Sequence, residues 1–308
     1  MLSNKDFSTF DIEIQHATTI DGVDINPNLN VAIVGYEIDD RSKYGSDYLG
    51  KISQIYSVVY NPIMCNITIN TETIEVNELP QFIQNEGWKD DSIVIDCTSV
   101  NVPELLLLMD AFKKVNIDKF DTLYIEPEDY MNPQIRKQNK RDFELSTKYE
   151  GYCSVPLYGK STHEDDVKVF CCGYEVARIQ NAMDALPIGQ KYTYILFGMP
   201  PFYSGWDMNA YYNHINFIDE HQLRDIYFCG ATNPLAVLVK LENIYNSLQP
   251  EQNLFLAPIG TKPMSLAVCL FLVEMAIDGR CALLFDHPLK KDHRTTKIGE
   301  VNLYKIHL

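Results

Sequence analysis

A chain of 308 residues with 26 basic and 42 acidic side chains has a formal net charge of −16, and 46% of its residues are hydrophobic. This composition is typical of a globular protein with one large or two ordinary domains, and it excludes a disordered or fibrous chain. The negative charge disfavours binding to duplex DNA, because a polyanion repels a surface of its own sign.

The hydrophobic stretches are too short to cross a membrane. The longest runs from Leu266 to Val273, whereas a membrane-spanning helix needs about 20 apolar residues. Residues 1–8 contain no charged segment followed by an apolar run, so no secretory signal is expected. The 8 cysteines have no C-x-x-C spacing and lie mostly in apolar segments, which favours buried, reduced thiols over disulfides or a thiolate metal site. We therefore expect a cytoplasmic, acidic protein with no metal ion.

Short β-branched or aromatic runs alternate with longer segments of helical periodicity, which is the pattern of β-α units around a mainly parallel sheet. In the first half, strands are predicted at 31–34, 92–96 and 122–125, and a helix over 103–115. The segment 38–92 fits this alternation less well, and we expect it to form an antiparallel edge or a cap.

The second half continues the alternation with more strands. They are predicted at 168–172, 192–197, 225–229, 254–256 and 281–285. Helices are predicted to begin at about Pro103, Pro234 and Pro263, because a proline in the first turn of a helix has no intrahelical hydrogen bond to lose.

The two halves resemble each other. Gly-Tyr-Glu follows a predicted strand at 35–37 and again at 173–175. Residues 95–103 and 255–263 both run from a strand through a turn to a helix-starting proline. We interpret this as an internal duplication of a Rossmann-like unit, in which the second copy carries an additional β-α element at 192–248. The alternative is that any two α/β segments look alike at this resolution.

The fold class is therefore predicted as α/β, with two Rossmann-like lobes and mainly parallel sheets. The segment 130–166, rich in Asn, Gln, Lys and Arg, is the candidate linker between them. This linker assigns residues 1–150 to the first lobe and residues 151–308 to the second.

The strongest candidate site is the turn after the strand 254–256. Ligands of open parallel sheets bind beyond the carboxyl ends of the strands, where helix N-termini present unpaired N–H groups. Here Gly260 permits a tight turn, Thr261 supplies a hydroxyl and Lys262 a positive charge. An anion such as phosphate suits this combination, although neither a Walker spacing nor G-x-G-x-x-G is present. The alternative is a helix N-cap followed by a solvated lysine.

The corresponding turn of the first half also carries small polar residues. Thr98, Ser99 and Asn101 follow the strand 92–96 and precede a predicted helix. They are ligand-binding candidates by analogy with the second half. Helix capping alone also explains residues of these types at this position.

The two Gly-Tyr-Glu sequences are further candidates. Tyr36 and Tyr174 each offer a ring for stacking, and Glu37 and Glu175 each offer a carboxylate for a ribose hydroxyl. Packing of the tyrosine in the core is the alternative. The aromatic loop 198–207 is interpreted either as a lid over a flat ligand such as a base or as a hydrophobic cover for the sheet.

No catalytic constellation emerges from the remaining residues. His214 and His221 are spaced to share a helix face, but further metal ligands are not apparent. Asp286 and His287 follow a predicted strand and are candidates for acid-base work, or else form a surface turn. No G-x-S-x-G motif, no H-E-x-x-H motif and no pair of E-x-x-H motifs of the di-iron type occurs. The sequence therefore supports no enzyme class.

The segment Leu254–Met264 is a hydrophobic strand that leads through Gly-Thr-Lys-Pro into an apolar helix. It resembles the ligand-binding motif of CRISPR-associated Rossmann-fold (CARF) domains, and two such units in one chain are similar to the fused arrangement of SAVED sensor domains. These families bind cyclic oligonucleotides made during antiviral signalling. The resemblance implies that residues 260–262 contact phosphate or ribose. It implies the same contacts from the first half for Thr98, Ser99 and Asn101. No nuclease, HEPN-type or protease segment is recognisable, so it also implies an effector on another chain.

We predict a protein that senses a nucleotide or cyclic oligonucleotide, as a component of a bacterial antiphage defence system, and reports binding to a protein partner or separate effector. Two alternatives stay open. One is a nucleotide or phosphodiester hydrolase in the same crevice, with Lys262 stabilising charge and Asp286 or His287 transferring protons. The other is a non-catalytic structural subunit whose crevice is empty. The sequence predicts no particular cofactor.

Overall fold

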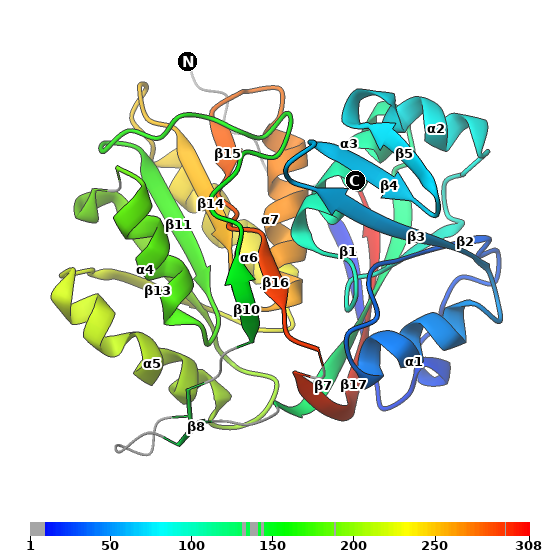
Figure 1. Ribbon diagram of the computed structural model, residues 1–308, viewed down its shortest axis with the longest axis horizontal. Helices are drawn as coiled ribbons and strands as arrows, with labels where there is room; N and C mark the ends of the chain where they lie inside the picture. Colours follow the sequence, from blue (N-terminus) through cyan, green and yellow to red (C-terminus); the bar gives the residue numbers. More distant parts are fainter. Residues whose placement is uncertain (1–9, 131–133, 136–140, 143–144, 188, 293) are drawn as a thin grey trace. The chain divides into compact units, whose positions relative to one another are not determined.

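The computed structural model describes residues 10–130, 134–135, 141–142, 145–187, 189–292 and 294–308 (Figure 1). Among them, those of Asn132–Lys291 form one compact unit, called unit 1, and those of Lys5–Met131 and Asp292–Leu308 form a second, called unit 2. Residues 1–8, where no secretory signal is expected, lie outside the described residues. Of the predicted linker 130–166, residues 131–133, 136–140 and 143–144 also lie outside them.

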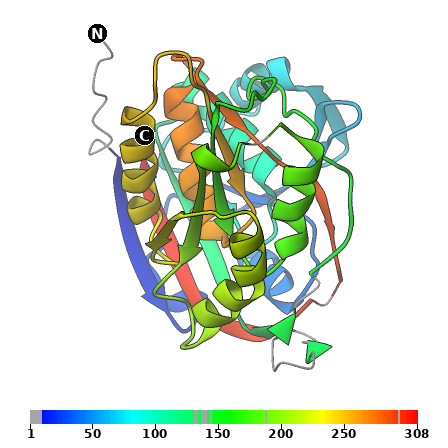
Figure 2. The same ribbon diagram turned by 90° about the vertical axis from the view of Figure 1, so that its left-hand side faces the viewer.

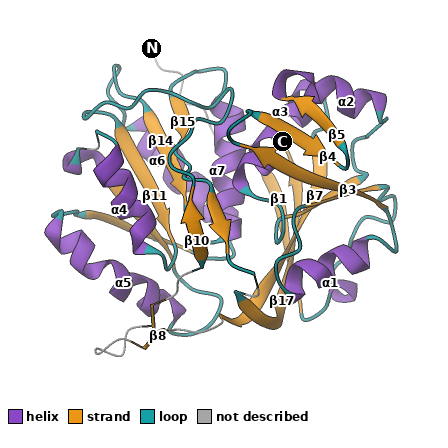
Figure 3. Ribbon diagram, viewed as in Figure 1, coloured by secondary structure: helices purple, strands orange, loops and turns teal. Residues whose placement is uncertain are grey.

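The fold is mixed α/β, as Figure 3 shows by colour. The helices of unit 2 are α1 (Asp40–Leu49), α2 (Leu79–Asn85) and α3 (Val102–Lys114). Those of unit 1 are α4 (Val176–Ala185), α5 (Trp206–Glu220), α6 (Pro234–Asn246) and α7 (Lys262–Met275). Among the described residues, no helix combines the length and the apolar character needed to cross a bilayer.

Unit 2 is built on a mixed sheet of eight strands in the order β1-β17-β7-β6-β2-β3-β4-β5. Their bounds are β1 (Asp11–Ala17), β2 (Val31–Val34), β3 (Gln54–Asn61), β4 (Asn66–Ile69), β5 (Glu72–Glu75), β6 (Ile93–Asp96), β7 (Lys119–Tyr130) and β17 (Thr295–His307). The central strands β3, β2, β6 and β7 are parallel, and the outer strands at both ends pair antiparallel. The segment 38–92 forms α1, the parallel strand β3, the antiparallel β4 and β5, and α2.

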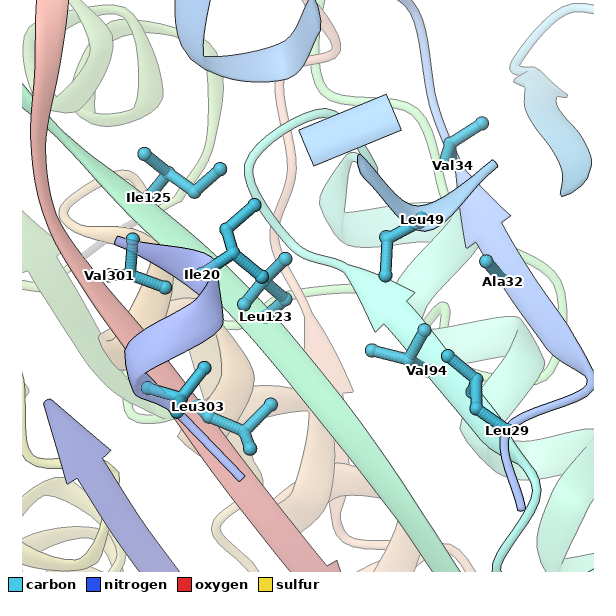
Figure 4. Packing of buried hydrophobic residues seen from close by; sticks show 11 residues of the cluster. Ile20, Leu29, Ala32, Val34, Leu49, Val94, Leu123, Ile125, Val301 and Leu303 are labelled. Carbon is cyan, nitrogen blue, oxygen red and sulfur yellow. The ribbon is translucent and has the colours of Figure 1, made fainter. Parts of the chain in front are cut away.

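One hydrophobic cluster in the core of unit 2 lies between α1 and this sheet (Figure 4). Leu49 of α1 packs among buried aliphatic side chains of β2, β6, β7 and β17. These are Ala32, Val34, Val94, Leu123, Ile125, Val301 and Leu303, with Ile20, Val23 and Leu29 from the segment between β1 and β2. Each fully buried Val, Leu or Ile contributes about 1.5–3 kcal/mol to stability relative to an exposed one.

The last strand differs from the sequence interpretation. Residues 292–308 were assigned to the second lobe, yet β17 lies between β1 and β7, with a register that runs from Thr295↔Tyr130 to His307↔Lys119. The compact units therefore divide the chain at 131/132 and 291/292, whereas the sequence suggested a single boundary near 150. The physical reason is pairing: β17 supplies backbone hydrogen bonds to two strands that are remote from it in sequence.

Unit 1 is built on a fully parallel five-stranded sheet in the order β13-β12-β11-β14-β15. Their bounds are β11 (Val167–Cys172), β12 (Thr193–Gly198), β13 (Asp225–Cys229), β14 (Leu254–Pro258) and β15 (Cys281–Leu283). Every residue of β11 and β14 is buried, as expected for strands covered on both faces. From β11 the chain adds β12 and β13 toward one edge of the sheet and then β14 and β15 toward the other edge. The strand order therefore reverses between β11 and β14.

Helices cover both faces of the parallel sheet of unit 1. Within the unit, α4 packs with α5, and α6 packs with α7. In the views of Figures 1 and 2, the first pair lies on one face of the sheet and the second pair on the other. Two short antiparallel pairs complete the unit. They are β8 (Gln134–Ile135) with β9 (Arg141–Asp142), and β10 (Ser146–Tyr149) with β16 (Pro288–Lys290).

Candidate functional site

Four loops meet at the carboxyl edge of the parallel sheet in unit 1. They follow β11, β12, β13 and β14 and lead into α4, α5, α6 and α7. Backbone hydrogen bonds join the second loop to the third, from Met199 N to Cys229 O (2.8 Å) and from Ala231 N to Pro200 O (2.9 Å). The Thr261 hydroxyl joins the fourth loop to the third, because it donates to Ala231 O (3.0 Å). The loops therefore form one connected surface.

The loops after β11 and β14 approach each other at two glycines. A Cβ atom on Gly173 would lie 3.1 Å from Ile259 O, and one on Gly260 would lie 3.0 Å from both Cys171 O and Cys172 O. These atoms belong to backbone and cannot move aside cheaply, so both positions favour glycine. The contact lies between β11 and β14, where the strand order reverses. In doubly wound sheets, ligands bind at this reversal point.

The N-terminus of α7 is not capped by a side chain. Thr261 is its N-cap residue, with the usual extended backbone (φ −72°, ψ 157°), but its hydroxyl bonds Ala231 O and not a helix amide. Within the part of the chain that the structure describes, neither the Gly260 nor the Thr261 amide donates a hydrogen bond. By contrast, Asn233 caps α6 by accepting from Ala236 N. Lys262, the first residue of α7, is partly exposed beside these amides.

An aromatic group adjoins this edge of the sheet. The ring of Trp206 lies 4.9 Å from that of Tyr203 and 6.3 Å from that of Tyr174, centroid to centroid. The Asn213 side chain of α5 donates to Tyr174 O (3.3 Å). The structure thus brings together the loop 198–207 and the second Gly-Tyr-Glu, two features that the sequence singled out separately. Tyr174 is buried, whereas Tyr203 and Trp206 are partly exposed.

Glu175 is engaged within unit 1. Its carboxylate accepts hydrogen bonds from Leu145 N (2.9 Å), the Ser146 hydroxyl (3.2 Å) and the Tyr149 hydroxyl (3.3 Å). Burial, followed by the charge of Glu175, raises the pKa of Tyr149, so this tyrosine remains a hydrogen-bond donor. Glu175 therefore fixes β10 to the start of α4. The ribose contact predicted for it stays a prediction.

Asp286 forms a buried ion pair. Arg178 of α4 donates to its two carboxylate oxygens, from Nε (2.8 Å) and Nη2 (2.5 Å). Burial disfavours the charge on Arg178, but the hydrogen bond and charge of Asp286 outweigh it and raise the Arg178 pKa. His287 donates through Nε2 to Cys153 O (3.2 Å), and its pKa is lowered chiefly by burial. Both hydrolase candidates thus have structural partners.

The turn of unit 2 is closed by internal hydrogen bonds. The Ser99 hydroxyl accepts from Gly35 N (2.8 Å) and donates to the Asp96 carboxylate (2.6 Å). The Thr98 hydroxyl accepts from Ile125 N (2.9 Å). Thr98 and Ser99 are both buried. Their side chains tie β2, β6 and β7 together, and the ligand contacts predicted for them stay predictions.

The other predicted residues of unit 2 are more accessible. Tyr36 is 71% exposed, and Glu37 is exposed beside it. Asn101 is the partly exposed N-cap of α3 and makes no side-chain capping bond.

The histidines and cysteines form no metal site among the described residues. His214 is buried on α5 and donates through Nδ1 to Ala210 O (2.9 Å), and burial lowers its pKa to about 4. It is therefore neutral and serves packing against Phe197. All eight cysteines lie among the described residues and none of them forms a disulfide, and burial raises the pKa of the Cys171 and Cys172 thiols.

Sequence reasoning missed three residues that shape these sites. Asp96 was read only as the end of a strand, although an aspartate two residues before a turn amide is a local signal for an Asx turn. Arg178 was read as an ordinary helix residue, and nothing local marks its partner more than 100 residues away. Asn213 gave no signal at all.

Comparison of the chain with known proteins found no match. No protein-family model, no curated protein and no solved structure matches it.

Proposed function

We propose that the chain binds a phosphorylated nucleotide at the carboxyl edge of the sheet in unit 1. The observation that carries this proposal is the uncapped start of α7 at the reversal of strand order, where the Gly260 and Thr261 amides donate to no described residue. A phosphate group supplies the acceptors that these amides lack.

The chemistry of the turn favours an anion. Hydrogen bonds from neutral groups to a charged partner each contribute about 1.5–3 kcal/mol. The dipole of α7 and the charge of Lys262 act in the same direction. Gly260 has no side chain, so a phosphate can approach its backbone closely.

The aromatic group favours a nucleotide over a simple phosphate. Trp206 and Tyr203 are partly exposed and adjoin the same loops. Base stacking on an aromatic side chain is worth about 1–3 kcal/mol per base. Together with the resemblance to CARF and SAVED domains, this supports a sensor of nucleotides or cyclic oligonucleotides in bacterial antiviral defence, which reports to an effector on another chain.

The same proposal includes an internal duplication of a Rossmann-like unit. In both units a Gly-Tyr-Glu sequence follows a central strand, and its glycine approaches the turn after the neighbouring strand. A Cβ atom would lie 2.5 Å from Ser99 O on Gly35 and 3.1 Å from Ile259 O on Gly173. In both units a helix with proline in its first turn follows, namely α3 and α7.

We prefer binding to hydrolysis because of the Asp286 ion pair. Both oxygens of this buried carboxylate accept hydrogen bonds from the Arg178 side chain, so the group already has a structural role and neither oxygen is directed at a substrate.

The test is to release small molecules from the purified protein for mass spectrometry and then to measure thermal shifts with mono-, di- and cyclic oligonucleotides. A ligand at about 100 times its dissociation constant stabilises the folded state by about 2.7 kcal/mol. Lys262→Ala is expected to lose most of that shift, while Lys51→Ala, at an exposed position of unit 2, retains it.

Three outcomes contradict the proposal in different ways. Consumption of the nucleotide favours the hydrolase. Absence of any ligand and any shift favours a structural subunit. A full shift in Lys262→Ala means that the ligand binds elsewhere.

A further inference from the structure

The hairpin of β3 and β4 in unit 2 carries no charged side chain. Residues 52–71, which contain both strands and the turn between them, are the longest stretch of the sequence without Lys, Arg, His, Asp or Glu, although charged residues make up 22% of the chain. Natural sheets commonly carry charges on strands at their edges, because charges oppose pairing with other proteins. This hairpin, next to the edge strand β5, lacks that protection.

One face of the hairpin is nevertheless exposed. Burial alternates along the antiparallel meander of β3, β4 and β5 (Figure 1), and in β3 the side chains of Ser57, Val59 and Asn61 are exposed. Val59 lies opposite Thr68, and Thr68 lies opposite Thr73, so the three side chains form a row across this face. The two threonine hydroxyls hydrogen-bond each other (3.3 Å), so the row satisfies part of its own hydrogen-bonding need.

The turn of the hairpin presents two large apolar side chains to solvent. Ile63 is 81% exposed and Met64 is 64% exposed. The side-chain oxygen of Asn61 accepts hydrogen bonds from Ile63 N and Met64 N (3.0 Å each), which fixes the turn. Fixed apolar side chains beside an uncharged face match the centre of a protein interface, which is depleted of charge and enriched in Met.

The charges that border this surface within residues 52–88 are all negative. Glu75 lies opposite Asn66, the first residue after the turn, and Glu72 and Glu78 are exposed before and after it in the chain. These three glutamates are called the acidic rim. Residues 52–88 contain no Lys, Arg or His. The surface is therefore complementary to a partner with an apolar centre and Lys or Arg around it.

We propose that the exposed face and turn of the β3–β4 hairpin bind a basic protein on another chain, with Ile63 and Met64 in an apolar pocket and the acidic rim against Lys or Arg of the partner. Other occupants suit the surface less well. The acidic rim repels nucleic acid and anionic membranes. A second copy bound through the same surface would bring two acidic rims together. The inference is independent of the nucleotide site proposed in unit 1.

The first test places the photo-reactive residue p-benzoylphenylalanine at position 64 of the full chain, in the cells that produce it. After irradiation, mass spectrometry identifies the cross-linked peptide. We expect a protein of positive net charge, attached at apolar residues flanked by Lys or Arg. The same residue at position 43, which is exposed on α1, is the matched control and should not give this adduct. No adduct from position 64, or an adduct with lipid, nucleic acid or a second copy, overturns the proposal.

The second test measures the affinity of the purified chain for the purified partner. Met64→Asp puts a charge at the centre of the surface and is expected to weaken binding by about tenfold or more. Glu75→Lys reverses a rim charge and is expected to weaken binding and to reduce its dependence on salt. Lys43→Ala should leave the affinity unchanged. All three positions are exposed, so the melting temperatures should stay close to that of the unsubstituted protein. Binding that neither of the first two variants weakens overturns the proposal.

Discussion

Glu126 is a buried carboxyl group, and hydrogen bonds through Asn302 connect it to His16 at the surface. Asn302 donates to Glu126 Oε1 (2.8 Å) and accepts from Nδ1 of the exposed His16 (2.5 Å). Burial raises the pKa of Glu126 from 4.5 to about 7, the charge of Glu300 adds to the effect, and Asn302 and Arg41 oppose it. The group therefore titrates near neutral pH in the folded state.

This titration predicts a pH dependence of stability. The folded state binds the proton of Glu126 more tightly than the unfolded state, so the contribution is fully present below pH 4.5 and is lost as the pH rises through about 7. It amounts to at most about 3 kcal/mol, from 1.36 kcal/mol per pKa unit. Glu126→Gln keeps an acceptor for Asn302 but cannot titrate. We expect its free energy of unfolding, measured by urea unfolding, to fall less between about pH 5 and about pH 8 than that of the unsubstituted protein.

A remaining decline is expected in this variant, because burial also raises the pKa of Asp121 to about 6. An unchanged slope in Glu126→Gln contradicts the assignment.

Gly260 supports a second prediction at the same scale. In Gly260→Ala the new methyl group would meet Cys171 O and Cys172 O at 3.0 Å, so β11 and β14 must shift apart. We expect a destabilisation of about 1–3 kcal/mol and loss of the nucleotide-dependent thermal shift. Gly230→Ala is the control, since its methyl group would meet its nearest neighbour, the Asn233 Cβ, at an ordinary 3.4 Å. Equal losses of stability in the two variants contradict the close approach.

Helix α4 is anchored to the segment after β15 by the Arg178–Asp286 pair. Arg178→Met leaves the Asp286 charge buried without its partner, and we expect a loss of about 3–5 kcal/mol in the free energy of unfolding. The double variant with Asp286→Leu is expected to recover most of that loss, because it removes both charges. Urea unfolding of the single and double variants measures the difference. A double variant as unstable as the single one argues against the ion pair as the cause.

The individual elements were largely predictable. The strand predicted at 31–34 forms β2, that at 225–229 forms β13, and α6 begins at Pro234. Local signals suffice here, because β-branched runs and helix-starting prolines act within a few residues. The pairing of β17 was not predictable, since its partners β1 and β7 lie far away in sequence and antiparallel register leaves no local trace.

The candidate site shows the same limit. Gly260, Thr261 and Lys262 do stand at a strand end, as their sequence context predicts. The direction of the Thr261 hydroxyl depends on Ala231 in another loop, and the engagement of Glu175 depends on β10. Residue types identify which groups are present, but tertiary neighbours decide which of them remain available.

At the scale of the whole molecule, β17 completes the sheet of unit 2. A chain without Thr295–Leu308 exposes an edge on β7 and leaves β1 with no partner strand. We expect unit 2 to unfold in this deletion while the sheet of unit 1 persists, since all its strands lie within Asn132–Lys291. Hydrogen exchange measures this as fast amide exchange throughout 31–130 and continued protection of β11 and β14. Protection of β2 and β6 in the deletion variant contradicts the prediction.

The two-part composition of unit 2 also affects how the protein is made. After β7 has emerged from the ribosome, the whole of Asn132–Lys291 must still be translated before β17 emerges. The later-encoded unit can therefore fold first, in contrast to the usual N-terminal order of co-translational folding. During that interval the nascent β7 has an unpaired edge on the side that β17 later covers, and this edge is open to pairing with strands of other chains.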